Sequence, residues 1–253
     1  MQRFITVDNL DLEINKKLLL PDDLFHHAVH VLRMKIGNQF ELVDATEQAY
    51  VCEIETLTKK EGTIKVVSTI DKNPELPINV SIVCGVSKGD KAEEIVKKGT
   101  QLGAASFYFI NSKYSVARWK NQKQNKKINR LQTIAKNAAE QSHRLKIPRV
   151  FWLNDFSELI DKSENYDLKL IAYEESAKQG EKSALAQMIN QLRQNHELSL
   201  IAFFGPEGGI AKDEVEQLTK NQFKCAALGP RILRAETAPL YLLSALSFGI
   251  ELE

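Results

Sequence analysis

Apolar, strand-like runs alternate with helical segments through the last two thirds of the chain, and this alternation limits the fold more than any other feature. The short apolar runs are residues 78–86, 106–110, 149–153, 168–174, 198–204 and 224–228. Segments with helical spacing lie between and after them, at residues 90–103, 127–142, 155–160, 183–194, 213–220 and 238–250. Strands that alternate with helices are typical of a parallel sheet covered by helices. The sequence therefore predicts an α/β fold for this part.

The segment before this alternating part has a different pattern. Predicted strands at residues 5–7, 39–45, 49–57 and 63–70 and one helical segment at 22–33 indicate a small β-rich, barrel-like domain. The stretch DKNPELP then interrupts the pattern with two prolines and no apolar spacing. We place a domain boundary there, which gives domains 1–72 and 73–253.

Composition and cysteine usage favour an intracellular protein. The chain of 253 residues is 43% hydrophobic, enough for one large or two ordinary domains. The N-terminus has no basic segment followed by an apolar stretch, and the longest apolar run, LYLLSALSFGI, is too short to span a bilayer. Cys52, Cys84 and Cys225 are too widely spaced for a zinc knuckle or a redox pair. We expect a soluble, cytoplasmic protein with reduced, structural cysteines.

Charge is distributed unevenly along the chain, although the net charge is only +1. Residues 73–149 contain fifteen Lys and Arg against five Asp and Glu. Within them the run KYSVARWKNQKQNKKINR (113–130) has seven basic residues, no acidic residue and the aromatic residues Tyr114 and Trp119. Such a run suits the phosphate backbone of a nucleic acid, with aromatic residues available for stacking. The alternatives are a solvated helix face and, for the two aromatic residues, core packing.

Three loops that follow predicted strands carry the residues of a candidate site. They contain YEES (173–176), GPEGG (205–209) and GPRILRAETA (229–238), and ligands of open α/β sheets bind where strands end in such loops. GPEGG lacks the lysine and hydroxyl of a nucleotide-triphosphate loop, and Glu207 disfavours phosphate, so we expect a neutral or cationic ligand. Its glycines could alternatively serve only the turn.

The motifs KGDK (88–91), EQSHR (140–144), GPEGG and LGPRILRAETA, together with HHAVHVLRMKIG (26–37), resemble the RsmE family over the whole chain. The resemblance implies a SPOUT-class methyltransferase that uses S-adenosylmethionine to methylate N3 of a uridine in 16S ribosomal RNA of the 30S subunit. It also implies an N-terminal PUA-like RNA-binding domain, a trefoil knot in the C-terminal domain and a homodimer. The last helix, apolar all round, predicts the same dimer through the C-terminal domain. Ala211 is a poor N-cap, so we expect the start of the helix after GPEGG to be stabilised by Asp213 and Glu214, whose acidic side chains favour a helix N-terminus.

The resemblance also implies the site residues. The cofactor is expected at the three loops and the strands before them: Leu170, Ala172, Tyr173, Glu174, Phe204, Gly205, Pro206, Glu207, Gly208, Gly209, Leu228, Gly229, Ile232, Leu233, Arg234, Glu236, Thr237 and Ala238. RNA is expected at Arg3, His30, Arg33, Lys35, Lys88, Lys91, Arg118, Lys120, Lys123, Lys126, Lys127 and Arg144. No metal is expected, although His26 and His30 are four residues apart on one helix.

Methylation at N3 requires loss of the N3 proton of uracil. Either a carboxylate acts as general base, or arginine donors stabilise the uracil anion as it forms. Arg234 is the first candidate for catalysis, and Glu140 and Arg144 are the next. Glu236 is a further candidate. Two rival functions remain at this point: an RNA-binding protein without catalysis, and a SPOUT enzyme that acts on transfer RNA.

Overall fold

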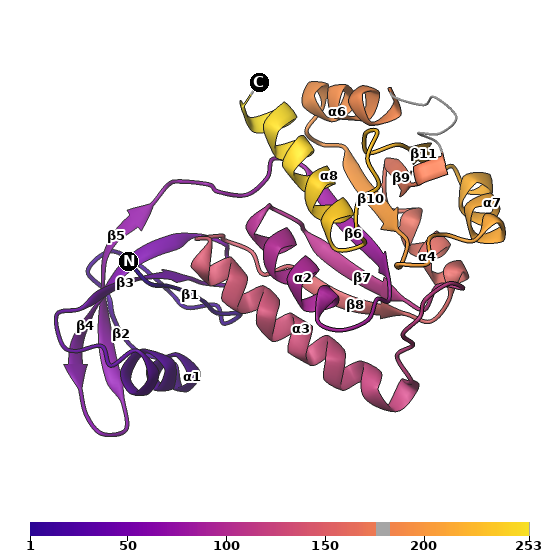
Figure 1. Cartoon of the computed structure of the whole chain (residues 1–253). Coiled ribbons are helices and arrows are strands. Elements are labelled where there is room, and N and C mark those ends of the chain that lie inside the picture. The colour runs from indigo at the N-terminus through magenta and orange to yellow at the C-terminus, as the bar shows by residue number, and fades with distance from the viewer. Residues whose placement is uncertain (176–182, 253) are drawn as a thin grey trace. The chain divides into compact units, whose positions relative to one another are not determined.

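The computed structural model describes residues 1–175 and 183–252, and its chain divides into two compact units (Figure 1). The first unit contains Met1–Glu75 and also Ala139–Lys146, and the second contains Leu76–Ala138 and Ile147–Glu253. The sequence placed the division between residues 72 and 73, three residues earlier. It did not indicate that 139–146 would return to the first unit, because residues 139–142 fall within the helix predicted at 127–142.

The first unit is built on a five-stranded sheet of order β1-β3-β4-β5-β2. Its strands are β1 (Arg3–Ile5), β2 (Lys17–Leu19), β3 (Gln39–Val43), β4 (Ala49–Leu57) and β5 (Gly62–Ile70). β1 and β3 are parallel, and the other pairs are antiparallel. Between β2 and β3 lie α1 (Asp22–Phe25) and a π-helical turn (His26–Val31).

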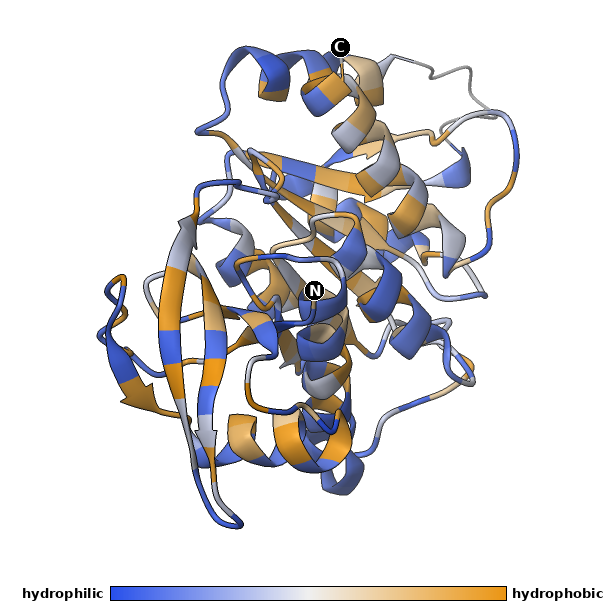
Figure 2. Cartoon of the chain, turned by 90° about the vertical axis from the view of Figure 1, so that its left-hand side faces the viewer, coloured by the Kyte–Doolittle hydropathy of each residue, from blue (hydrophilic) through white to orange (hydrophobic). Residues whose placement is uncertain are grey.

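The core of the first unit follows from the alternation of its long strands. Cys52 and Ile54 of β4 and Ile64 and Val66 of β5 are buried in one cluster, whereas the residues between them are more exposed. Figure 2 shows this alternation of apolar and polar residues along the long strands. One face of the sheet is therefore apolar, as expected for antiparallel strands with one wet face. Strand β2 was not predicted, because three residues are too few to show a period.

The second unit contains a six-stranded, entirely parallel sheet of order β11-β9-β10-β6-β7-β8. The strands are β6 (Asn79–Gly85), β7 (Ser106–Ile110), β8 (Arg149–Leu153), β9 (Leu168–Ala172), β10 (Ser199–Phe204) and β11 (Lys224–Ala226). The helices are α2 (Lys91–Gln101), α3 (Asn121–Gln141), α4 (Phe156–Ser163), α6 (Ala184–Gln194), α7 (Lys212–Lys220) and α8 (Thr237–Ser247), with a π-helical turn at Phe248–Leu252. The predicted α/β fold with a parallel sheet is thereby confirmed.

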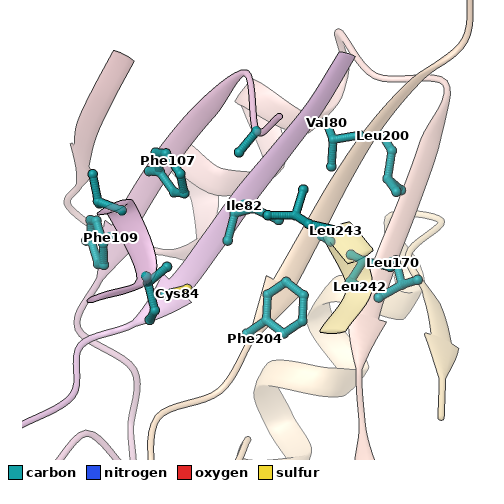
Figure 3. Close-up of a cluster of buried hydrophobic side chains, with 14 of the residues drawn as sticks. Val80, Ile82, Cys84, Phe107, Phe109, Leu170, Leu200, Phe204, Leu242 and Leu243 are labelled. Carbon is teal, nitrogen blue, oxygen red and sulfur yellow. The ribbon is translucent and has the colours of Figure 1, made fainter. Parts of the chain in front are cut away.

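Apolar clusters cover both faces of this sheet, which explains why its strands are continuously apolar. On one face, side chains of β6, β7, β9 and β10 pack with α2, α3, α6 and α8. Figure 3 shows Leu242 and Leu243 of α8 beside Ile82 and Phe204 in this cluster. On the other face, Val83 and its neighbours pack with α4 and α7.

The described part of the chain also bears on two other predictions. Cys52, Cys84 and Cys225 form no disulfide within the described residues, in agreement with the expected reduced cysteines. Burial raises the pKa of the Cys52 thiol to about 12, so this group stays protonated at neutral pH. None of the helices that the structure describes is long and apolar enough to cross a membrane.

Candidate active site

The candidate site begins with four loops at one edge of the parallel sheet. Strands β11, β9, β10 and β6 are consecutive neighbours and all parallel, so their carboxyl ends lie in a row. The loops after β6, β10 and β11 carry KGDK, GPEGG and GPRILRAETA, and the segment after β9 begins with Tyr173 and Glu174. Open α/β sheets bind ligands at such an edge.

The GPEGG loop runs so close to neighbouring backbone that side chains would not fit. A Cβ on Gly208 would lie 2.6 Å from the carbonyl oxygen of Tyr114, and a Cβ on Gly85 would lie 2.6 Å from Pro206. Gly209 differs, because its φ is +80° and the space around it is open. The loop thus packs tightly on one side and presents bare main chain on the other.

Lys91 connects this loop to the β11–α8 loop. Its Nζ lies 3.0 Å from Oε1 of Glu207 and 3.1 Å from Oε2 of Glu236, and Oε1 of Glu207 also accepts from the backbone N–H of Lys88 at 3.1 Å. The three side chains are partly buried, at 17–28% exposure. Three segments that are distant in sequence are therefore held together by one ammonium group.

The ionisation of this cluster follows from its contacts. The hydrogen bond to Glu207, and then the one to Glu236, raises the pKa of Lys91. Burial alone would raise the pKa of Glu207 and of Glu236, but backbone hydrogen bonds and Lys91 outweigh it, so both carboxyls have a lowered pKa. The cluster consequently carries two negative charges and one positive charge at neutral pH.

Helix α7 begins at Lys212, one residue before the predicted start, and Glu214 in its first turn caps it because the N-cap residue Ala211 has no side-chain acceptor. Oε2 of Glu214 accepts from the backbone N–H of Ala211 at 3.0 Å, and its Oε1 accepts from the N–H of Lys113 at 2.7 Å. The hydroxyl of Ser112 donates to the same carboxylate at 3.0 Å. Asp213 forms an exposed ion pair with Lys113. Sequence reasoning missed Ser112, because nothing near it in the chain marks its partner a hundred residues later.

The β11–α8 loop exposes several of the residues predicted for the site. Gly229 has a φ of +104°, Ile232 is 75% exposed, and Arg234 is exposed. The carbonyl oxygen of Arg234 accepts from the N–H groups of Thr237 and Ala238, which fixes the start of α8. Within residues 1–175 and 183–252 no ion pair involves the Arg234 guanidinium, but its charge contributes to the lowered pKa of Glu236.

The other predicted cofactor residues differ in what they can present to a ligand. Leu170 and Phe204 are buried core residues of β9 and β10. Ala172 ends β9, Tyr173 donates its N–H to the carbonyl oxygen of Ala226, and Glu174 is exposed. Four more predicted residues belong to the loops after β10 and β11 and are at least partly buried: Gly205, Pro206, Leu228 and Leu233.

Glu140 and Arg144 belong to the first unit and are engaged there. Glu140 is 4% exposed, and its Oε1 accepts from the backbone N–H of Ile5 at 3.2 Å. Arg144 is 3% exposed and forms an ion pair with Glu75, whose Oε1 also accepts from the N–H of Leu145 at 2.8 Å. These contacts tie 139–146 to the first unit, and the catalytic role expected for both residues stays a prediction.

Arg3, which we expected to contact RNA, is buried and hydrogen-bonded within the first unit. It is 4% exposed, and its Nε donates to Oε2 of Glu41 at 2.7 Å. Nδ1 of His143 lies 2.7 Å from the same oxygen. Burial would raise the pKa of Glu41, but the hydrogen bonds from Arg3 and His143 lower it. Lys91, likewise expected at RNA, is held by two carboxylates as described above.

The remaining residues expected at RNA lie near the surface. The exposed residues among them are Lys88, Arg118, Lys120, Lys123, Lys126 and Lys127 of the second unit and His30, Arg33 and Lys35 of the first. Helix α3 begins at Asn121 rather than at the predicted Lys127, so most of the basic run is helical. Trp119 is a core residue at 6% exposure, and Tyr114 is half exposed.

His26 and His30 are the two residues that the sequence suggested as a pair of metal ligands. His26 and His30 stand side by side, with ring centroids 5.3 Å apart. No group of three or more His, Cys, Asp or Glu residues there could hold a metal ion.

Comparisons with known proteins agree with this geometry. Residues 74–247 match the family model of an RNA methyltransferase domain, and residues 20–67 match that of an RNA methyltransferase PUA domain. The ribosomal RNA small subunit methyltransferase E of Bacillus subtilis is 41% identical over 253 residues, which cover 100% of this chain and 98% of the relative.

Two solved structures are similar over nearly the whole chain. A crystal structure of a hypothetical protein is 37% identical with a TM-score of 0.90, over 99% of both chains. The ribosomal RNA small subunit methyltransferase E of Neisseria gonorrhoeae, bound to S-adenosylmethionine, is 25% identical with a TM-score of 0.81, over 98% of this chain and 97% of that one. The fold is thus that of SPOUT methyltransferases with an N-terminal PUA-like domain. The chain belongs to the ribosomal RNA small subunit methyltransferase E family, whose cofactor is S-adenosylmethionine.

Proposed function

We propose that this enzyme transfers a methyl group from S-adenosylmethionine to N3 of a uridine in 16S ribosomal RNA of the small ribosomal subunit. The observation that supports it most is the row of loops at the sheet edge, with Arg234 exposed beside the Lys91 cluster. The 41% identical relative is a small subunit methyltransferase by name, and its likeness extends over the whole chain.

The loop residues fit the cofactor. Gly209 and Gly229 both have a positive φ. A Cβ added to Gly209 would meet no atom within 4 Å, and one added to Gly229 would meet only the Tyr241 hydroxyl, at 3.9 Å. Their main chain is therefore open to a ligand. Glu207 and Glu236 supply negative charge, which suits a sulfonium cation. When bound, S-adenosylmethionine supplies an electrophilic methyl group. Backbone groups of Leu228, Ile232 and Leu233 would face the adenine, and the GPEGG backbone the methionine and ribose.

Residues of this chain must promote loss of the proton from N3 of uracil before the methyl group can be transferred. Arg234 keeps its charge at any working pH and presents a planar fork of donors. Its role is to hydrogen-bond a uracil carbonyl oxygen as negative charge grows there, an oxyanion-type stabilisation. Because Glu140 and Arg144 are buried in contacts of the first unit, Arg234 is the residue we assign to catalysis first.

The proposal extends to partners and topology. The exposed lysines of α3 and its preceding segment contact RNA phosphates, and His30, Arg33 and Lys35 give the PUA-like domain a second RNA contact. The enzyme acts as a homodimer through α8, its C-terminal domain is a trefoil knot, and it works on ribosomal RNA in the cytoplasm. The exposed apolar side chains of Tyr241 and Phe248 support the dimer.

The function is tested by methyl transfer from labelled S-adenosylmethionine into 30S subunits, free 16S RNA and transfer RNA. We expect label in the small subunit RNA and none in transfer RNA. Label in transfer RNA alone would instead support a tRNA enzyme. A calorimetric titration that detects no cofactor binding would support an RNA-binding protein without catalysis.

A further inference from the structure

A cavity of about 340 Å³ lies between α2 and α3 of the second unit, and neither the cofactor nor the catalytic assignment uses it. The two helices run beside each other in Figure 1. Its volume is at the lower end of the range for small-molecule sites, about 300–1,000 Å³. Residues from the start of α2, from the segment before α3 and from the first turns of α3 form its wall.

The inner wall of the cavity is apolar and continuous with the core. Ala92, Trp119 and Leu131 contribute to it, and each is at most 8% exposed. Trp119 stacks with Phe109 and with Trp152, at centroid distances of 5.4 and 5.6 Å. This wall is therefore an extension of the core and offers an aromatic, preformed surface.

The mouth of the cavity is cationic. Lys123, Lys126, Lys127 and Arg130 line it from one side of α3, because residues three, four and seven apart share a helix face. Nζ of Lys127 lies 4.9 Å from the centroid of the Trp119 ring, and Arg130 pairs with Glu93. For the three lysines no ion pair is found within the described residues. Their charge is thus available to an anionic ligand.

We propose that this cavity holds one unpaired nucleotide of the RNA substrate, with the base against the apolar wall and neighbouring phosphates on the lysines. The inference rests on the proposed function, since the strand is the RNA to be methylated. Stacking on aromatic residues within a basic groove is how proteins hold single strands. Lys123 and Arg130 are seven positions apart, which corresponds to about 10 Å along the helix. The cationic row is therefore longer than a single phosphate and suits a strand.

The bound nucleotide is a neighbour of the target and not the methylated uridine. Arg234 belongs to the β11–α8 loop, which does not line the cavity. Ala92 of the cavity and Lys91 of the cluster with Glu207 and Glu236 are consecutive residues in the first turn of α2. A strand held in the cavity would therefore have its register fixed close to the cofactor loops.

The experiment uses Trp119 as the reporter. The chain has two tryptophans, so Trp152→Phe leaves Trp119 alone. This full-length protein is titrated, without cofactor, with a single-stranded oligoribonucleotide and with the same ribose–phosphate chain lacking bases. We expect the oligonucleotide to quench Trp119 fluorescence and to bind about tenfold more tightly than the baseless chain.

A second variant tests whether the tenfold difference in affinity arises from the cavity. Ala92→Leu fills the apolar wall, and Lys97→Leu adds the same side chain at an exposed position of α2 outside the cavity. Ala92→Leu should remove the quenching and the tenfold preference, whereas Lys97→Leu should keep both. Calorimetric binding of S-adenosylmethionine checks that each variant is folded.

Equal affinity and equal quenching for the two chains in the Trp152→Phe protein would overturn the proposal, even if Ala92→Leu fails to fold. Quenching by an acidic peptide but not by the oligonucleotide would assign the cavity to a protein partner and overturn it as well. These outcomes are measured as RNA binding without cofactor. A failure of the proposed function would show instead as absent methyl transfer.

Discussion

At the scale of single residues, Lys91 is the side chain that organises the site. It binds Glu207 and Glu236, which come from loops about thirty residues apart in sequence. The sequence motifs indicated that both glutamates would lie near the cofactor, but they indicated RNA for Lys91. A lysine at the surface of a basic segment and a lysine that closes a carboxylate pair look the same in one sequence, because the difference depends on tertiary contacts alone.

Removing this ammonium group should cost stability only in a defined pH range. The pKa of both carboxyls is lowered below 4.5, so their contribution is present above pH 4.5 and is lost as the pH falls through the folded-state values. The pKa of Lys91 is raised above 10.5, so its contribution is present below pH 10.5 and is lost as the pH rises through the folded-state value.

We therefore expect Lys91→Gln to lower the free energy of unfolding by about 1 kcal/mol between these limits. Urea unfolding of wild type and variant across a pH series measures it, with Lys98→Gln, which removes an exposed ion pair on the same helix, as the control. A difference that stays constant below pH 4 would show that Lys91 acts through packing and not through charge.

The catalytic assignment predicts a defect in turnover from Arg234→Lys. The variant keeps the positive charge but loses the planar fork, so cofactor binding and most RNA affinity should remain. Loss of one oxyanion-type donor typically lowers the rate by about 10²–10³, and a higher pH should partly restore it because more uracil is then ionised. Single-turnover methylation at saturating cofactor and RNA measures the effect. A near wild-type rate would remove Arg234 from catalysis.

At the scale of elements, the basic run is expected to contact RNA, and the last helix is expected to contact a second subunit. The sequence predicted the helix at 127–142, but α3 begins at Asn121. Its first turns are rich in lysine and asparagine and lack the apolar spacing that marks a helix, so the pattern alone placed the start too late. The consequence is functional, since the lysines are ordered along one helix face.

Replacing Lys120, Lys123, Lys126 and Lys127 with Gln should weaken RNA binding and leave cofactor binding intact. Four lost phosphate contacts should reduce the slope of log affinity against log salt by about three. Filter binding at several salt concentrations measures the slope, and Lys97→Gln with Lys98→Gln is the matched control. An unchanged slope would show that the basic run is a solvated helix face that does not contact RNA phosphates.

Helix α8 is divided between core and surface. Leu242, Leu243 and Leu246 are fully buried in the cluster beneath it, whereas Tyr241 is 40% exposed and Phe248, just beyond its end, is 57% exposed. A second copy would cover this remaining apolar surface. We expect light scattering to give a dimer at micromolar concentration and Phe248→Asp with Tyr241→Asp to give a monomer. Val7→Asp, at an exposed apolar residue of the first unit, should remain dimeric. A wild-type monomer would contradict the dimer.

At the scale of the whole molecule, the alternating pattern was sufficient for the α/β class, and the motifs were sufficient for the family. The return of Ala139–Lys146 to the first unit was not predictable. It depends on buried contacts of Arg3, Glu140 and Arg144 with residues far away in the chain. The sequence suggested RNA binding or catalysis for these side chains and gave no sign of their burial, because buried charged contacts leave no periodic signal in a sequence.

The central claim is that the methyl group is placed on N3 of a uridine in small subunit RNA, and the modified nucleoside itself tests it most directly. Small subunits lacking the modification are incubated with the enzyme and labelled S-adenosylmethionine, and their RNA is digested to nucleosides for chromatography and mass spectrometry. The account predicts that the label elutes as 3-methyluridine and that Arg234→Lys forms it more slowly. Label in a methylated cytidine, purine or ribose, or a uridine methylated at C5, would contradict it.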